Sequence, residues 1–375
     1  MTSRSVAALL SAAAVVAGCA TAHPPITPAS IREQVRRSVG DARAAGFVIP
    51  YEVSDELKAR ALAEVAGPGD ANVIIRRLVS FLTDPDRLNL QYDRDQTLPA
   101  ALAIDGGGGD CLTLTNLFVG LTRAMGLPTF FAEALEGRAY GEDDGLTVEY
   151  RHICAGFSQG TATTIIDFDR VVTGVVNYRP LTDLEAVARY YNTLGFQEFR
   201  HANVDVAIEH FELASVLDPR LSWAHNNLGV AYSRSGDTKL AEEHYRKAMA
   251  LDPEYLSPYN NLAALYHREG KHDLARAMER EATRRRLRNP YLLVHRGYDL
   301  LARQETDDAA KTFRRALAAD GHLLQARLGL AEAYLQRGDY NRALQQVDKA
   351  LRGSPGNAAA EQLRDRILAQ QRVSR

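Results

Sequence analysis

Two kinds of hydrophobic pattern follow one another along the first half of the chain. Apolar residues recur at helical spacing over 31–45, 55–66 and 71–82, and the last of these stretches stops just before Pro85. From residue 128 onward, β-branched and aromatic residues dominate instead, in "PTFFAEAL", "LTVEYRHICAGF" and "TATTIIDF". Such runs are typical of strands. Helices followed by strands predict an α+β domain with an antiparallel sheet.

The second half of the chain repeats itself with a period of 34 residues. "LDPR" begins at 217 and "LDPE" at 251, and "NTLGF" begins at 192 and "NNLGV" at 226. Small residues recur at the eighth position of each unit, and alanine recurs at the twentieth and the twenty-seventh, which lets paired helices approach closely. Five consecutive units fit this period: 188–221, 222–255, 256–289, 290–323 and 324–357.

This period and its key positions resemble the tetratricopeptide repeat. The resemblance implies an all-α solenoid with a protein or peptide partner in its groove, and a terminal helix over 358–371 that covers the last apolar face. Asn192, Asn226 and Asn260 share the fifth position of three units. Such a ladder would hydrogen-bond the backbone of an extended peptide, although chance recurrence or simple solvation explains it equally well.

Composition narrows the classes of partner. The chain has 375 residues, with 45 basic and 47 acidic side chains, so no large field points toward nucleic acid. A local basic run, "ATRRRLRNP" at 282–290, is read as a solvated helix face, with a patch for an anionic partner as the alternative. Three cysteines are too few for a disulfide framework, and each therefore needs its own explanation.

The first cysteine lies at the end of an N-terminal apolar run. "MTSRSVAALLSAAAVVAGCA" has one arginine, a short apolar segment and small residues before Cys19, which is typical of a secretory signal. "VAGC" resembles a bacterial lipobox, which implies that Cys19 is lipidated and anchors the mature protein to a membrane. Because Ala20 is not acidic, we expect the outer membrane, facing the periplasm. An ordinary cleaved signal peptide is the alternative, and "ATAHPPITPAS" reads as a tether.

The second cysteine opens a helical pattern in "GGGGDCLTLTN" at 106–116. Asp110 is a good N-cap, and Cys111 then takes the first helical position, where the helix dipole favours a thiolate. The glycines are expected to let a bound substrate's backbone come close. One apolar stripe follows along the helix, formed by Leu114, Leu117, Phe118, Leu121 and Met125.

A cysteine nucleophile needs a base and a group that orients the base. His152 lies in one expected strand and Asp167 in the next. If the hairpin turns at Gln159-Gly160, the numbers of two directly opposed residues add up to 319. His152 then faces Asp167 directly, with Cβ atoms roughly 5 Å apart. Asp169 would then be only a diagonal neighbour of His152. A slip by one residue would put His152 and Asp167 on opposite faces.

These segments together resemble the transglutaminase-like core, a papain-related family. The resemblance covers roughly residues 75–175 and rests on "GDCLTLTNLFVGLTRAMGLPTFF", the His152 strand and "IIDFD". It implies that Cys111 is the nucleophile, His152 the base and Asp167 its orienter, with no cofactor and no metal. The implied reaction is attack on an amide through a thioester, resolved by water or by an amine. An inactive domain that serves as a protein-interaction scaffold is the alternative.

Cys154 shares the strand face of His152 by the period of two. It is read as a packed small residue, with a disulfide to Cys111 that silences the nucleophile as the alternative. Taken together, the patterns predict a signal peptide, a tether, a transglutaminase-like α+β domain, an all-α tetratricopeptide-repeat solenoid and a capping helix with its tail. These segments cover 1–18, 19–30, 31–187, 188–357 and 358–375, respectively.

Overall fold

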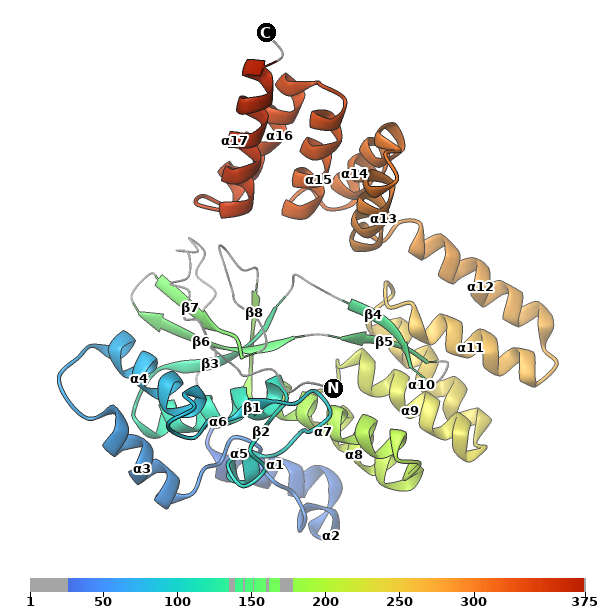
Figure 1. The fold of residues 1–375 in the computed structure, drawn as a ribbon. Coiled ribbons are helices and arrows are strands. Elements are labelled where there is room, and N and C mark those ends of the chain that lie inside the picture. The colour runs from blue at the N-terminus through green and yellow to red at the C-terminus, as the bar shows by residue number, and fades with distance from the viewer. Residues whose placement is uncertain are drawn as a thin grey trace. The chain divides into compact units, whose positions relative to one another are not determined.

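The structure, a computed structural model, describes residues 26–134, 139–143, 146–150, 152–159, 162–168 and 178–373. The chain forms two compact units, one ending at Asn261 and the other running from Leu262 onward (Figure 1). The segment expected to be a signal peptide and Cys19 lie outside the described residues. Among the residues described, no helix is long and apolar enough to cross a membrane.

The first unit begins with short helices whose caps are readable from the sequence. Ser54, Asp70 and Asp110 each accept a hydrogen bond from a backbone N–H in the first turn of the helix that follows. The expected helix over 31–45 is divided at Gly40, whose φ of +83° ends one helix and begins the next. Within residues 26–134 the helices are α1 (Pro28–Val39), α2 (Asp41–Ala44), α3 (Asp55–Val65), α4 (Ala71–Thr83), α5 (Ala100–Ala103) and α6 (Cys111–Ala124).

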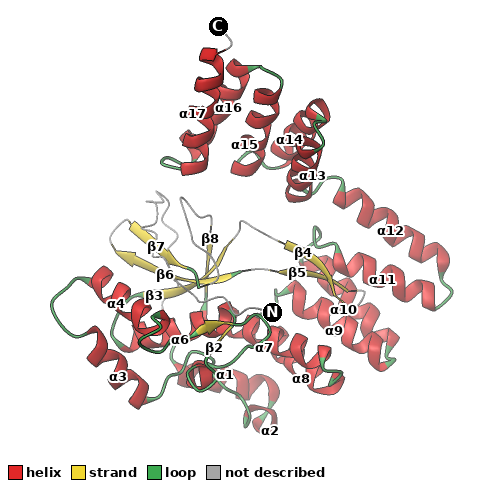
Figure 2. Cartoon of the chain, viewed as in Figure 1, coloured by secondary structure: helices red, strands yellow, loops and turns green. Residues whose placement is uncertain are grey.

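An antiparallel sheet follows these helices, as the hydrophobic pattern predicts. Its order is β7-β6-β3-β8, with β3 (Thr129–Ala134) and β6 (Ile153–Gln159) at the centre and β7 (Ala162–Ile166) and β8 (Tyr178–Leu181) outside (Figure 2). Two smaller pairs accompany it. One is the antiparallel hairpin of β4 (Ala139–Asp143) and β5 (Leu146–Tyr150), and the other is the parallel pair β1 (Gln91–Tyr92) and β2 (Gly108–Gly109).

The sheet corrects two expectations about the strand that carries His152. "LTVEYRHICAGF" does not form one strand, because β5 ends at Tyr150 and β6 begins at Ile153, so His152 lies between them. The β6–β7 register also differs. Ala155 opposes Ile166 and Gln159 opposes Ala162, so opposed residues sum to 321 rather than 319. Because the shift is two residues, every side chain keeps its face. His152 and Asp167 are therefore diagonal neighbours at the open end of the hairpin, not a directly opposed pair.

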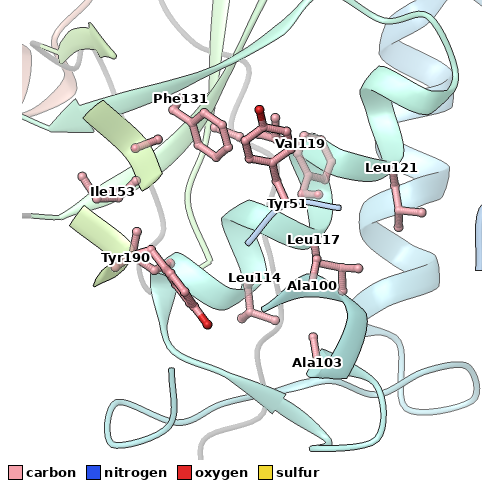
Figure 3. Packing of buried hydrophobic residues seen from close by; sticks show 14 of the residues in the cluster. Tyr51, Ala100, Ala103, Leu114, Leu117, Val119, Leu121, Phe131, Ile153 and Tyr190 are labelled. Carbon is pink, nitrogen blue, oxygen red and sulfur yellow. The ribbon is translucent and has the colours of Figure 1, made fainter. Parts of the chain in front are cut away.

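Helix α6 is almost entirely buried and packs against β3, β6 and α5. Figure 3 shows Leu114 and Leu117 of α6 facing Ala100 and Ala103, whose small side chains let α5 approach. Gly120 serves the same purpose further along the helix, since a Cβ there would lie 2.1 Å from the backbone oxygen of Tyr51. Four residues of the predicted stripe are therefore buried and Met125, the last, is half-buried. This packing holds α6 against the sheet.

The chain then becomes entirely helical. In the first unit, helices α7 (Asp183–Arg200), α8 (Val204–Leu217), α9 (Ser222–Ser235) and α10 (Thr238–Leu251) follow, and α11 (Ser257–Arg268) extends from the first unit into the second. The second unit continues with α12 (His272–Arg286), α13 (Pro290–Ala302), α14 (Thr306–Ala319), α15 (Leu324–Gln336), α16 (Tyr340–Gly353) and α17 (Ala358–Val373). A helix is thus present at the expected capping segment.

The repeat positions have a clear packing role. A Cβ on Gly195 would lie 2.7 Å from the ring of Phe211, and the same relation joins Gly229 to Tyr245. Glycine at the eighth position therefore makes room for an aromatic ring at the twenty-fourth position of the same unit. In the fourth repeat, 290–323, Gly297 accommodates the ring of Phe313 at the same two positions.

Helix α7 packs into the same hydrophobic core as the helices and strands before it. Tyr190 and Tyr191 lie in one cluster with the α6 residues, and the hydroxyl of Tyr191 donates to the Val48 carbonyl at 2.9 Å. Asp183, at the start of α7, accepts both guanidinium nitrogens of Arg123 at 2.9 and 3.0 Å. Helix α7 starts five residues before the first expected repeat unit, and it is anchored at both of these points.

Candidate active site

The N-terminus of α6 is held by a buried cap. One carboxylate oxygen of Asp110 accepts the backbone N–H and the hydroxyl of Thr113, each at 2.8 Å, and the other accepts the Thr97 hydroxyl at 2.6 Å. The predicted N-cap is confirmed. Burial raises the pKa of Asp110, and these hydrogen bonds oppose that rise. Cys111 is the first helical residue, where backbone N–H groups have no partner within the helix.

The glycines before Cys111 serve a different purpose from the one expected. Gly108 and Gly109 form β2, which pairs with β1, and both are buried. A Cβ on Gly108 would lie 2.0 Å from the backbone oxygen of Gln91, and its φ is +132°. At Gly108 the backbone that comes close is therefore that of the protein's own strand β1. Through this contact β1 holds the loop that leads into α6.

His152 and Asp167 are joined at the end of the sheet. The Nε2 of His152 lies 2.6 Å from Oδ1 of Asp167, and the two side chains are 9% and 6% exposed. His152 precedes β6 and Asp167 follows β7, so the two strands bring them together from positions 15 residues apart. Because Nε2 is engaged by Asp167, the other ring nitrogen, Nδ1, is left for Cys111.

Cys111 and His152 also interact. Burial by itself lowers the pKa of His152, but hydrogen bonds to Asp167 and Cys111 and the charges on both groups outweigh it and raise that pKa to about 10. The imidazolium is therefore favoured at neutral pH when Cys111 and Asp167 are negative. The structure thus brings the three predicted residues together, with His152 bonded to Asp167 and interacting with Cys111.

Two residues that the sequence does not reveal connect this site to α7. The side-chain Nε2 of Gln197, on α7, donates to the Thr97 hydroxyl at 2.9 Å and to the Asp95 carbonyl at 3.2 Å. Thr97 in turn donates to Asp110, so a hydrogen-bond series runs from α7 to the cap of α6. Gln197 lies 100 residues from Thr97, and no motif in either segment points to this contact.

Cys154 is packed and reduced. Its side chain is 1% exposed, and its Sγ donates to the Ala132 carbonyl at 3.5 Å. Cys111 and Cys154 are both free thiols in the structure. Burial raises the pKa of Cys154, with the charges of Asp167 and Cys111 adding to the effect. The arrangement is that of a packed small residue, with no disulfide to Cys111.

The asparagine ladder in the repeats takes a different path from the expected one. Asn227 Nδ2 donates to Asn192 Oδ1 at 3.0 Å, and Asn261 Nδ2 donates to Asn226 Oδ1 at 3.0 Å. Asn226 is 2% exposed, whereas Asn260 is exposed and is not part of the ladder. The amide groups therefore join successive first helices of the repeats to one another.

Among the described residues, no group of three or more His, Cys, Asp and Glu side chains could hold a metal ion. The chemistry available at the described site is that of a cysteine, an imidazole, a carboxylate and the free N–H groups of a helix N-terminus.

Comparison with known proteins identifies the helical part of the chain. Models of the tetratricopeptide repeat match residues 222–255, 244–277 and 295–358. No curated protein matches the chain. Among solved structures, one from the functional characterisation of Pseudomonas aeruginosa pilF is 24% identical, covers 50% of this chain and 86% of that chain, and has a TM-score of 0.26.

Two further structures are of similar rank. A thermophilic tetratricopeptide-repeat protein of Thermus thermophilus is 27% identical over 48% of this chain and 97% of that one, with a TM-score of 0.25. Yeast Tom70 is 21% identical, covers 51% of this chain and 48% of that chain, and has a TM-score of 0.28. The match at residues 222–255 coincides with one unit of the 34-residue period, and the match at 295–358 covers most of the fourth and fifth units. The chain therefore carries tetratricopeptide repeats, which are helical repeats that typically bind protein or peptide partners.

Proposed function

We propose that the chain is an exported lipoprotein whose transglutaminase-like site acts on amide bonds, while its repeats bind a protein partner. The observation that carries the enzymatic part is the hydrogen bond between His152 and Asp167, together with the electrostatic interaction between His152 and Cys111. A nucleophile, a base and an orienting carboxylate in contact are what acyl transfer by a cysteine requires. The likeness of residues 75–175 to the transglutaminase-like core supports the same assignment.

The reaction follows from the position of each group. The Cys111 thiolate attacks the amide carbonyl carbon, and the oxyanion that forms is stabilised by the backbone N–H of Cys111 at the start of α6. The C–N bond then breaks, and His152 gives its proton to the leaving nitrogen, which leaves a thioester. Water or an amine, deprotonated by His152, attacks the thioester and releases an acid or a new amide. Asp167 keeps the imidazole oriented throughout.

An assay with two acceptors tests this reaction. The protein is incubated with a glutamine-rich peptide and a fluorescent primary amine, and both ammonia release and amine incorporation are measured. With wild-type protein we expect ammonia release, which accompanies thioester formation, and amine incorporation in addition if an amine rather than water resolves the thioester. Both signals should be lost in the Cys111→Ser and His152→Ala variants. Cys154→Ser serves as the matched control, because Cys154 is packed away from solvent. Equal product with Cys111→Ser would contradict the proposal.

A non-catalytic interaction scaffold is the second candidate. It is favoured by the comparisons, because the family models that match the chain are those of the repeats. In this case the Cys111→Ser variant would capture the same partner proteins as the wild type, and neither protein would release a reaction product. In the enzymatic case, the same variant would retain its substrate and accumulate an uncleaved complex.

The membrane anchor rests on "VAGC" at 16–19 and the apolar run before it. Metabolic labelling with a palmitate analogue in a bacterial host tests it. We expect labelled protein in the outer-membrane fraction and no label on the Cys19→Ser variant. Label that persists in Cys19→Ser would place the acylation elsewhere and contradict the proposal.

A further inference from the structure

Helix α12 departs from the repeat pattern at two positions that shape its surface. The twenty-fourth position of the other four units is Phe211, Tyr245, Phe313 and Val347, all of them buried. In the third unit this position is Glu279, which is exposed and paired with His267 at 2.8 Å. The thirty-first position is aspartate in three units, at 218, 252 and 320, but Arg286 in the third. In the third repeat, the twenty-fourth position is therefore acidic where the other repeats are apolar, and the thirty-first is basic where three others are acidic.

The same segment is not covered by the family models. The matches end at residue 277 and resume at residue 295, so the second half of α12 and its connection to α13 lie between them. This segment holds the arginine run noted in the sequence. The departure from the repeat pattern is therefore local, and the segment that departs contains both charge substitutions, Glu279 and Arg286.

An open cavity of about 490 Å³ lies at this segment, within the second unit. Arg280 and Arg284 are one helical turn apart on α12, and Arg288 follows just after the helix ends. Arg315 comes from α14 and donates to the Leu287 carbonyl at 2.8 Å, which positions α14 against the end of α12. The cavity is lined by Glu279, Arg280, Thr283, Arg284, Leu287, Arg288 and Arg315.

The charge of this cavity is only partly neutralised. Arg284 pairs with Glu281, which also holds Arg285 at 2.7 Å. Among the residues that the structure describes, no carboxylate lies within ion-pairing distance of Arg280 or Arg288. Four guanidinium groups thus face one opening whose only lining carboxylate, Glu279, is paired with His267. Arginine forks bind carboxylates through two parallel hydrogen bonds.

We propose that this cavity binds an acidic peptide segment of a partner protein, with its carboxylates on Arg280 and Arg288 and an apolar side chain on Leu287. Leu287 is 42% exposed and gives the cavity an apolar part. The mixture of forked cations and one exposed leucine fits a peptide better than a bare anion. The site lies on second helices of the repeats, α12 and α14, whereas the asparagine ladder runs along first helices. The proposed site uses no residue of the ladder, and it does not depend on the proposed reaction.

Fluorescence anisotropy on the full chain tests this site. The probe is a labelled octapeptide of glutamate and aspartate with one central leucine, and the comparison peptide has glutamine and asparagine in place of the acids. We expect the acidic peptide to bind, the amide peptide not to bind, and the affinity to fall as salt rises. The variant R280Q/R288Q should weaken the affinity by about tenfold or more, since it removes two charge-assisted contacts.

The matched control is R303Q/R352Q, which removes two exposed arginines that do not line the cavity. Circular dichroism checks that both variants fold, as expected for surface positions. A Leu287→Ser variant tests the apolar contact and should weaken binding without changing the slope against salt. Equal losses in the two arginine variants would overturn the proposal, because general positive charge would then explain the binding. Binding to phosphatidylglycerol vesicles or to inorganic phosphate, with none to the peptide, would overturn it as well.

Discussion

At the scale of single residues, two buried histidines have pKa values shifted in opposite directions by their neighbours. His152 gains two acidic partners, and its pKa rises to about 10 despite burial. His225 has the opposite environment in the repeats. Burial lowers its pKa to about 4, with Lys247 and His244 adding to the effect. Its Nδ1 lies 3.2 Å from Nδ1 of His244, so only one of the two can donate.

This environment predicts acid sensitivity of the repeats. The folded state disfavours protonated His225, and the pKa of His244 is lowered by burial too, although Glu243 and Glu212 oppose that change. In the unfolded chain His225 binds a proton near pH 6.5, whereas in the folded chain it does so only near pH 4. The free energy of unfolding therefore decreases as pH falls from 6.5 toward 4. We expect His225→Gln to reduce this loss by about 1–2 kcal/mol. Urea titrations at pH 7 and pH 5 measure it, with exposed His322→Gln as the control. Equal pH slopes would contradict the prediction.

Residues near one another in sequence could be predicted, and distant partners only in part. Asp110 and Cys111 follow from local capping rules, and the helix confirms the cap. His152 and Asp167 follow from alternation, which tolerates a shift of two residues but does not reveal it. Thr97 and Gln197 could not be predicted, because their contact depends on how α7 packs beside the N-terminus of α6.

At the scale of elements, β1 and α7 hold the N-terminal end of α6. Strand β1 lies against Gly108 in the loop that leads to the helix, and Gln197 of α7 bonds Thr97, which bonds the cap. The α6 sequence supplies the helix itself, while its exact placement depends on these two neighbours. Both contacts can be removed by single substitutions with matched controls.

Substitution of Gln197 or Thr97 tests the contact with α7. Gln197→Ala removes two hydrogen bonds, to Thr97 and to the exposed Asp95 carbonyl, and should cost about 1–2 kcal/mol. Thr97→Val removes a bond to the buried Asp110 carboxylate and should cost about 2–3 kcal/mol. Both variants should also slow alkylation of Cys111. Urea unfolding and alkylation rates measure the two effects, with the exposed Gln336→Ala as the control. A stable Thr97→Val protein would contradict the account.

Substitution of Gly108 tests the contact with β1. Gly108→Ala would place a methyl 2.0 Å from the Gln91 oxygen, at a φ of +132°, so we expect a loss of about 3 kcal/mol or complete unfolding. Gly107→Ala is the matched control. It has a φ of +72° but no atom within 4 Å of the added methyl, so it should cost about 1–2 kcal/mol. Equal losses, measured by denaturant midpoints, would show that strain and not packing requires glycine at Gly108.

At the scale of the whole molecule, one hydrophobic core joins the α+β part to the first repeat. The cluster extends from Ile31 to Ala224 and includes Tyr190 and Tyr191 of α7. The sequence predicts both parts but not this shared core, because the 34-residue period and the strand pattern each describe only their own segment. The first repeat is therefore part of the framework of the candidate active site.

Truncation tests this shared core. A chain that ends at residue 182 loses Asp183, Tyr190 and Tyr191, and should not unfold cooperatively. A chain that ends at residue 256 keeps α7 to α10 and should retain a cooperative thermal transition. Circular dichroism melts of the two fragments measure the difference. A cooperative transition in the shorter fragment would show that the α+β part folds without α7.

The most direct measurement of the central claim is the alkylation rate of Cys111 by iodoacetamide at pH 6, followed by mass spectrometry. If His152 and Asp167 hold Cys111 as a reactive thiolate, His152→Ala should slow the reaction by about tenfold or more, and Asp167→Asn by a smaller factor. The control His322→Ala should react as the wild type does. Equal rates in wild type and His152→Ala would contradict the account, because Cys111 would then react without the help of its proposed base.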